Sequence, residues 1–170
     1  ENAMKHEIMP LPELGPGEVL VQVMAAGVNY NGVWAALGQP LSVLDVHKQE
    51  FHIAGSDASG VVWAVGPGVR TCKPGDEVVL HCNQTCGQCE QCQGGDPMAC
   101  TEQRIWGYET PWGSFAQFTK VQAQQARRVA PQDFFQLGVG EERRELLDRR
   151  DRARPGRVRR GVGGLEGALG

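Results

Sequence analysis

The sequence predicts a mainly β domain, a barrel or a sandwich, and three observations support this fold class. Short stretches alternate between polar and apolar residues, glycine and proline punctuate them closely, and one segment of the first half resembles a short helix. A parallel sheet between helices would need longer helical segments between its strands. The 170 residues, 41% of them hydrophobic, suffice for one domain but not for two full ones.

The expected elements follow in chain order. A first strand covers Glu18–Val23, after a Gly-Pro-Gly turn, and the one expected helix of the first half covers Asn31–Leu37. A β-branched strand covers Ala58–Val65, and a third strand, Glu77–His81, follows a Lys-Pro-Gly-Asp turn. Alternation resumes at Gly113–Val121, which predicts a further strand.

Charge divides the chain near Ala126. The net charge of −3 is the sum of −7 through residue 126 and +4 beyond it, where every basic residue is arginine. We therefore expect a folded domain at residues 1–126 and an Arg/Gly-rich tail at residues 127–170 that is disordered or translated out of frame. An arginine-rich arm for nucleic acid is the alternative for the tail, weakened by its interleaved acidic residues.

Composition also excludes several classes of protein. No apolar run approaches the roughly 18 residues of a membrane-spanning helix, so no membrane partner is expected. The small negative charge gives no general case for nucleic-acid binding. The start of the chain carries no secretory signal, which makes the cytoplasm the expected location.

The strongest chemical signal is a group of cysteines with metal-ligand spacing, at Cys86, Cys89, Cys92 and Cys100. Four thiolates complete the tetrahedral shell that zinc prefers and leave no position for water, so the predicted role is structural. Disulfides or free thiols fit less well without a secretion signal, and the spacing differs from common iron–sulfur patterns. Cys72 and Cys82 lie outside the group, and each is expected to be a small buried apolar residue.

The order of several short motifs along the chain is more specific than any one of them. AAGVNYN, GSDASGVVWAVG, KPGDEVV, the cysteine lobe and GSFAQF resemble the N-terminal, GroES-like substrate domain of the medium-chain dehydrogenase/reductase superfamily. VNYNGVW, HIAGSDASGVVWAVG, DEVVLHCNQ, GGDPM and QRIWGYET resemble the crotonyl-CoA carboxylase/reductase family, over about residues 10–125. The resemblance implies a GroES-like, partly open barrel with a zinc-binding lobe and one structural zinc per chain.

The sequence departs from zinc alcohol dehydrogenases at their catalytic metal. Where those enzymes carry a cysteine and a His-Glu pair, this chain has Asn29 and Ser56-Asp57. Because asparagine and serine supply neither thiolate nor imidazole, we expect no catalytic metal. Three histidines are expected to be surface or hydrogen-bonded residues and not substitute ligands: His47, His52 and His81. Metal-free reduction of a C=C bond polarised by a thioester fits better.

The family resemblance also implies roles for five residues. Asn31 and Glu109 match residues that help to hold carbon dioxide beside a short-chain enoyl-CoA, while Asn29, Tyr30 and Tyr108 are candidates for the substrate pocket. An asparagine N–H can donate to a carbon dioxide oxygen, and a carboxylate can orient a water or a histidine. Two plainer roles stay open: Asn31 as a helix cap and Glu109 as a surface carboxylate.

The resemblance ends after residue 125. No glycine fingerprint for a dinucleotide follows a predicted strand, so the α/β domain that would bind NADPH is expected to be absent. This suggests a truncated or frameshifted family member, inactive by itself. A non-catalytic, zinc-stabilised GroES-like module is the alternative, and a fragment of a zinc alcohol dehydrogenase is a weaker one. The oligomeric state stays open.

Overall fold

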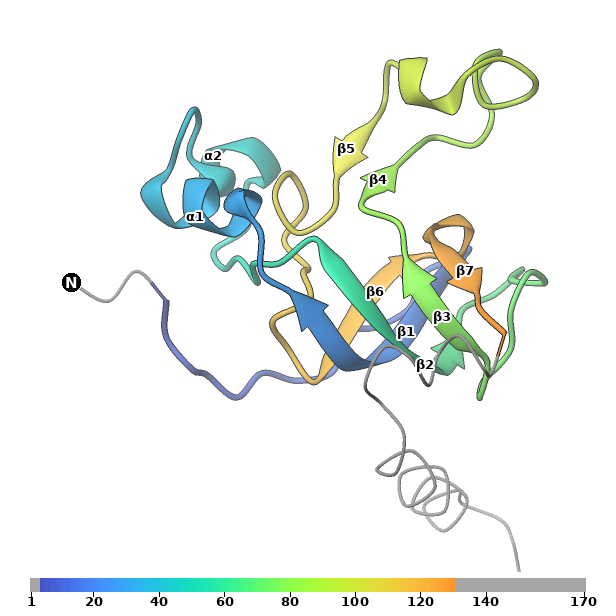
Figure 1. The fold of residues 1–170 in the computed structure, drawn as a ribbon, viewed down its shortest axis with the longest axis horizontal. Helices are drawn as coiled ribbons and strands as arrows, with labels where there is room; N and C mark the ends of the chain where they lie inside the picture. Colours follow the sequence, from blue (N-terminus) through green and yellow to red (C-terminus); the bar gives the residue numbers. More distant parts are fainter. Residues whose placement is uncertain (1–3, 131–170) are drawn as a thin grey trace, which may run out of the picture. The chain divides into compact units, whose positions relative to one another are not determined.

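The computed structural model of the protein describes residues 4–130, at whose centre lies a five-stranded antiparallel sheet (Figure 1). The strand order is β6-β1-β2-β3-β7. Their bounds are β1 Glu18–Gly27, β2 Asp57–Val65, β3 Glu77–Leu80, β6 Phe118–Gln122 and β7 Ala126–Arg128. Within the described residues the sheet is open, with β6 and β7 at its edges, which agrees with a partly open barrel and rules out a closed one.

The first three predicted strands are confirmed, and the fourth needs correction. β1 begins at the expected Glu18 but continues to Gly27, because its second half pairs with β2 across two register shifts. The strand expected over Gly113–Val121 exists only as β6, Phe118–Gln122. Residues 113–115 leave the ladder because Ser114 and Phe115 donate their backbone N–H groups to Gly55 and Ala54.

The expected helix is present as α1, Tyr30–Leu37, which lies beside the end of β1 (Figure 1). A second helix, α2 Val43–His47, was not predicted, because five residues are too few to show helical periodicity. Two 3-10 turns complete the elements, η1 Pro97–Ala99 and η2 Ala123–Gln125. In the described part of the chain, no helix combines the length and apolar character needed to cross a bilayer.

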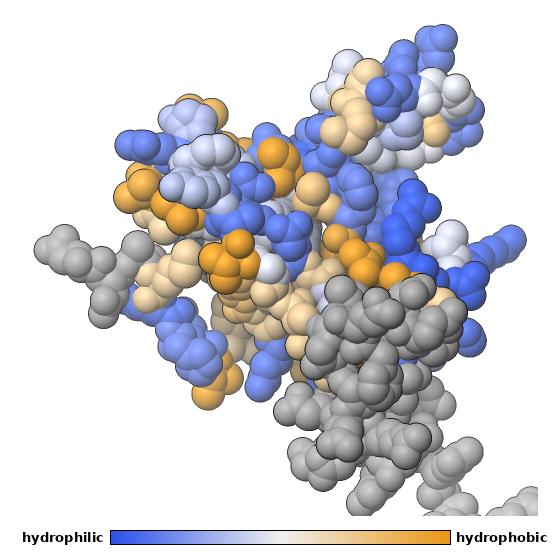
Figure 2. Space-filling view, in the orientation of Figure 1, coloured by the Kyte–Doolittle hydropathy of each residue, from blue (hydrophilic) through white to orange (hydrophobic). Residues whose placement is uncertain are grey.

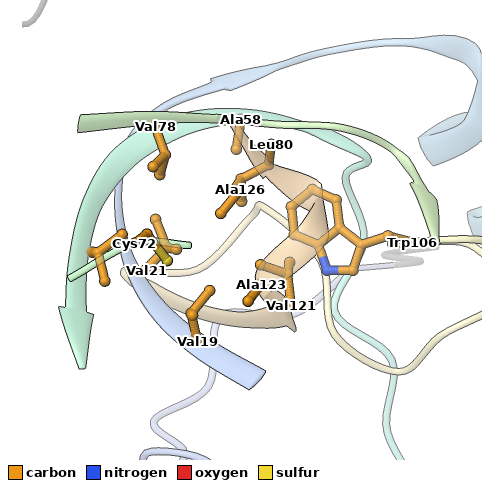
Figure 3. Packing of buried hydrophobic residues seen from close by; sticks show 11 residues of the cluster. Val19, Val21, Ala58, Cys72, Val78, Leu80, Trp106, Val121, Ala123 and Ala126 are labelled. Carbon is orange, nitrogen blue, oxygen red and sulfur yellow. The ribbon is translucent and has the colours of Figure 1, made fainter. Parts of the chain in front are cut away.

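Buried side chains from the sheet and its loops form the hydrophobic core. Figure 3 shows the strands curving around valines from β1 and β3, with the indole of Trp106 closing one end. Trp106 is 1% exposed, so a loop residue, not a strand residue, supplies the largest buried side chain. Cys72 is part of this core, which confirms the prediction made for it.

The cysteine-rich segment leaves the sheet through a separate two-stranded ladder (Figure 1). β4, Asn83–Gln84, pairs antiparallel with β5, Arg104–Ile105, and the residues between them form the lobe. Cys82, just before β4, is only half-buried and contacts the Asn83 amide oxygen, so the burial predicted for it is wrong. At this point the chain leaves the core, which explains the partial exposure.

The last strand spans the predicted domain boundary. β7 pairs Arg128 with Val78 and Ala126 with Leu80, and Val129 donates its backbone N–H to Glu77. The tail predicted for residues 127–170 lies outside the described residues from 131 onward, so its disorder stays a prediction.

Candidate functional site

The four predicted metal ligands come together in the lobe between β4 and β5. The sulfur atoms of Cys86, Cys89, Cys92 and Cys100 all lie within 4.8 Å of one another. The Cys86 and Cys92 sulfurs are 3.9 Å apart, and those of Cys89 and Cys92 are 3.5 Å apart. A tetrahedron with metal–sulfur bonds of about 2.3 Å has sulfurs about 3.8 Å apart, so this cluster has the size of a metal site.

Backbone N–H groups support the sulfurs in a way that suits thiolate ligands. Cys89 donates its N–H to the Cys86 sulfur at 3.4 Å, and Cys86 donates to the Cys100 sulfur at 3.5 Å. Hydrogen bonds from the backbone of Gln88 and Cys89 lower the pKa of the Cys86 thiol to about 6. Cys89 receives a hydrogen bond from the Cys92 backbone, but the surrounding thiols raise its pKa to about 11. The donor set and its spacing fit a metal held by four thiolates.

A glutamine outside the lobe contacts its first residues. Gln124, in η2, donates its side-chain amide to the carbonyl of Thr85. The oxygen of the same side chain lies close to Gly87: a Cβ added at this glycine would be only 2.9 Å from it. No sequence pattern predicts this contact, since Gln124 is distant from the cysteines along the chain.

The second site gathers where β1 ends, α1 begins and β2 begins. Asn29 is the N-cap of α1, and its side-chain oxygen accepts the N–H groups of Asn31 at 2.9 Å and Gly32 at 3.4 Å. Its amide nitrogen donates to the Ser56 hydroxyl at 2.9 Å and to the Asp57 carboxylate. The alternative that Asn31 caps the helix is therefore wrong, because Asn29 holds that position.

Asn31 reaches the same hydroxyl from inside the first turn of α1. Its amide nitrogen donates to Ser56 Oγ at 3.2 Å. Ser56 is 1% exposed, so its hydroxyl is buried. This buried hydroxyl accepts two amide N–H groups, one from Asn29 and one from Asn31. Asn29 thus links Ser56 and Asp57, and Asn31 joins the same hydrogen-bonded group through Ser56.

The loop that carries Tyr108 and Glu109 packs against the start of β2. Gly107 has φ +72°, and a Cβ there would lie 1.9 Å from the carbonyl oxygen of Gly55, the neighbour of Ser56. Only glycine permits both this backbone conformation and this approach. Further along, Ile53 donates its N–H to Pro111 at 2.9 Å. Residues far apart in sequence are thereby brought beside one another.

Within that loop, Glu109 has a local hydrogen-bond partner and Tyr108 has a distant one. The half-buried Glu109 accepts the N–H of Ile105 at 2.6 Å, so it is not simply a surface carboxylate. Tyr108 donates its hydroxyl to the carbonyl of Gln39 at 2.6 Å, which ties the loop to the segment after α1. Tyr30 is 71% exposed, with its ring 6.0 Å from that of Trp34.

The histidines are hydrogen-bonded or exposed, as predicted. His47 Nε2 and His52 Nδ1 are 3.2 Å apart, and the two rings are stacked. Burial first, and then the neighbouring His47, lowers the pKa of His52 to about 4, with the Gly107 backbone offsetting part of the effect. His81 is exposed and accepts the N–H of Asn83.

Around the second site, apolar side chains are exposed on both short helices (Figure 2). Leu37 and Leu41 are each 63% exposed, and Trp34 and Leu44 are close to half exposed. Polar residues are interspersed among them in Figure 2, so the face is mixed in character.

Residues 15–131 match the family described as Alcohol dehydrogenase GroES-like domain. The crotonyl-CoA carboxylase/reductase of Cereibacter sphaeroides is 66% identical over 125 residues, which are 74% of this chain and 29% of that protein. The crotonyl-CoA reductase of Streptomyces avermitilis is 45% identical over 131 residues, 69% of this chain and 29% of that protein.

The solved structure of the 2-octenoyl-CoA carboxylase reductase CinF from a Streptomyces species, in complex with NADP and 2-octenoyl-CoA, is also similar. It superposes with a TM-score of 0.67 at 42% identity, over 71% of this chain and 30% of that one. The chain thus spans less than a third of the length of these relatives. With a family match over most of its length, the chain belongs to the alcohol dehydrogenase GroES-like domain family of the medium-chain dehydrogenase/reductase superfamily.

Proposed function

We propose that this chain supplies the substrate domain of an NADPH-dependent enoyl-CoA reductase/carboxylase of the crotonyl-CoA carboxylase/reductase type. The observation that carries the proposal is the contact between Asn29 and Ser56 at 2.9 Å. In zinc alcohol dehydrogenases, which this domain resembles, those positions carry metal ligands. Here the Asn29 amide instead donates to the Ser56 hydroxyl, in a chain that is 66% identical over 125 residues to a crotonyl-CoA carboxylase/reductase.

The chemistry requires no Lewis acid on the substrate. NADPH, when bound, would supply the hydride for a C–H bond at the β-carbon of the enoyl thioester. The electron pair of the C=C bond then resides at the α-carbon as an enolate, stabilised by the thioester carbonyl. That pair either forms a C–C bond to carbon dioxide, giving a carboxylate, or takes a proton, giving the saturated thioester.

The roles proposed for Asn31 and Glu109 follow from the N–H group and the oxygen that these side chains do not use in the hydrogen bonds described above. Asn31 uses one amide N–H on Ser56, so its second N–H can donate to an oxygen of carbon dioxide. Glu109 uses one carboxylate oxygen on Ile105, so the other can orient a water or a histidine. Asn29, Tyr30 and Tyr108 are proposed for the substrate pocket, Asn29 by holding the start of α1.

For the lobe, we propose one structural zinc bound by Cys86, Cys89, Cys92 and Cys100. All four candidate ligands are cysteine sulfurs with a spacing suited to zinc, and a full tetrahedral shell of thiolates would leave no position for a reacting water. The metal would thus hold the lobe together and take no part in hydride transfer. We also retain the proposed division into a domain at residues 1–126 and a tail at residues 127–170, of which Arg127 and Arg128 continue the sheet as part of β7.

A chimera tests the proposed activity. Residues 10–125 of this chain would replace the matching segment of the Cereibacter sphaeroides enzyme, and NADPH oxidation with crotonyl-CoA would be measured with and without bicarbonate. We expect oxidation in both cases and the α-carboxylated acyl-CoA only with bicarbonate. A folded chimera that reduces without carboxylating would point to a plain reductase. One that does neither would favour the non-catalytic module.

A further inference from the structure

The buried hydroxyl of Ser56 is the point at which the two asparagines of the second site meet. Ser56 directly precedes β2 and is 1% exposed. Its oxygen accepts N–H groups from Asn29 at 2.9 Å and from Asn31 at 3.2 Å. Since a hydroxyl oxygen has two lone pairs, these contacts use its full acceptor capacity.

The two asparagines depend on Ser56 to different degrees. Asn29 has other partners, because its oxygen caps α1 and its amide nitrogen also contacts Asp57. For the Asn31 side chain, Ser56 Oγ is the sole hydrogen-bond partner among residues 4–130. Loss of the hydroxyl would therefore leave Asn29 in place and release the carboxamide of Asn31.

We propose that Ser56 is a positioning residue that aims the free N–H of Asn31 at carbon dioxide. This inference rests on the proposed function, in which Asn31 holds carbon dioxide. The terminal torsion of asparagine is soft, so an unanchored carboxamide samples a broad range of orientations. With one N–H held by Ser56, the planar amide directs the other along a single line.

A fixed donor matters more for this ligand than for most. Carbon dioxide is uncharged and its oxygens are weak acceptors, so its placement depends on donors that are already oriented. Hydride transfer to the β-carbon does not involve carbon dioxide. Ser56 should therefore affect how the enolate is partitioned between carboxylation and protonation, while leaving the rate of reduction unchanged.

The contact itself can be tested on the 170-residue chain by nuclear magnetic resonance of the asparagine side-chain amides. In S56A we expect the Asn31 amide protons to exchange faster with solvent and to move toward the shifts of a free carboxamide, while Asn29 changes little. S114A removes a second serine hydroxyl that is also 1% exposed and should leave Asn31 unchanged. An Asn31 signal unaffected by S56A would overturn the proposal.

The consequence for chemistry is tested in the chimera described above. S56A should lower the ratio of carboxylated to simply reduced product about tenfold, the loss expected for one oriented hydrogen bond, with bicarbonate-free reduction within about twofold of the parent. S114A should keep the parent ratio, and S56T, which retains a hydroxyl, should restore most of it. If S56T does not fold, S56C provides the weak acceptor and should give an intermediate ratio.

The outcomes separate this inference from the proposed function. An inactive parent chimera refutes the proposed function and, with it, the role of Ser56 in carboxylation, whatever the amide signals show. An active chimera whose product ratio is the same in S56A and the parent refutes the positioning role alone. A fall in reduction equal to the fall in carboxylation would also refute it, because that pattern indicates general damage to the site.

Discussion

Asn29 shows how much of this site depends on one side chain. Its oxygen caps α1 while its nitrogen contacts Ser56 and Asp57 at the start of β2. The same amide therefore fixes the direction in which the chain enters the helix and the distance from helix to sheet. Because backbone N–H groups bind the oxygen, the orientation of the amide follows from its partners.

Replacing Asn29 by alanine should lower the free energy of unfolding by about 1–2 kcal/mol, since two backbone N–H groups of α1 lose their acceptor. N29S keeps a capping oxygen and should stay within about 0.5 kcal/mol of the parent. Denaturant unfolding of the three proteins measures the difference. Equal stability of N29A and N29S would show that the cap contributes nothing.

His52 should make stability depend on pH below neutrality. Burial and the neighbouring His47 lower its pKa from 6.5 to about 4. Between these values the unfolded chain binds a proton that the folded chain does not, so stability rises with pH through this window and falls on acidification. Because the ring is only partly buried, we expect the loss between pH 7 and pH 4 to be on the order of 1–2 kcal/mol.

The variant H52Q removes the titrating imidazole and should flatten the dependence of stability on pH between pH 4 and pH 7. Acid also protonates the cysteine ligands, so the difference between H52Q and the parent, and not the parent profile alone, isolates the histidine. The exposed His81 offers the control H81Q, which should keep the parent slope. A slope shared by all three proteins would contradict the assignment.

At the scale of elements, the loop of residues 106–115, which follows β5, packs against residues 53–55, just before β2. It supplies Trp106 to the core, contacts Gly55 through Gly107, and contributes its own hydrogen bonds to residues 53–55. None of these contacts belongs to a strand ladder. The loop is therefore held by packing and by backbone contacts that only the folded chain provides.

The substitution G107A should move this loop away from Gly55, just before β2. A Cβ 1.9 Å from the Gly55 carbonyl, added to a positive φ, requires the backbone to move, and we expect a loss of more than about 3 kcal/mol. Gly68 has a similar φ of +79° with no atom within 4 Å of its added Cβ, so G68A should cost only about 1 kcal/mol. Similar losses in the two variants, measured by urea unfolding, would argue against the close contact.

At the scale of the whole molecule, the lobe and the sheet are stabilised by different interactions. The sheet buries an apolar cluster, whereas the lobe has few buried apolar residues and gathers four cysteines instead. The lobe should therefore depend on metal and the sheet should not.

Metal analysis should find one zinc per chain. C100S should release it and lower the melting temperature by on the order of 10 °C, while C82S, outside the cluster, should retain both the metal and the stability. A second, open-coordinated metal in the parent protein would contradict the assignment of Asn29 and Ser56 as a metal-free site. Unchanged zinc content in C100S would contradict the assignment of the lobe.

The sequence alone determined features that are encoded locally. Alternation and turn residues predicted β1, β2 and β3 to within a few residues, and the cysteine spacing predicted which sulfurs would meet. The absence of a catalytic metal at Asn29 and Ser56 stays a prediction, which rests on the residue types at these positions. The short α2 was missed, and the length of the last predicted strand was wrong.

Only the tertiary structure decided which side chains form hydrogen bonds with each other. That both asparagines donate to Ser56, and that Gln124 donates to Thr85 in the lobe, depends on contacts between segments far apart in the sequence. Such contacts form only when the sheet brings β1, β2 and the loop after β5 together. A local pattern carries no record of which distant group will satisfy a buried donor or acceptor, because that is settled by the packing of the whole domain.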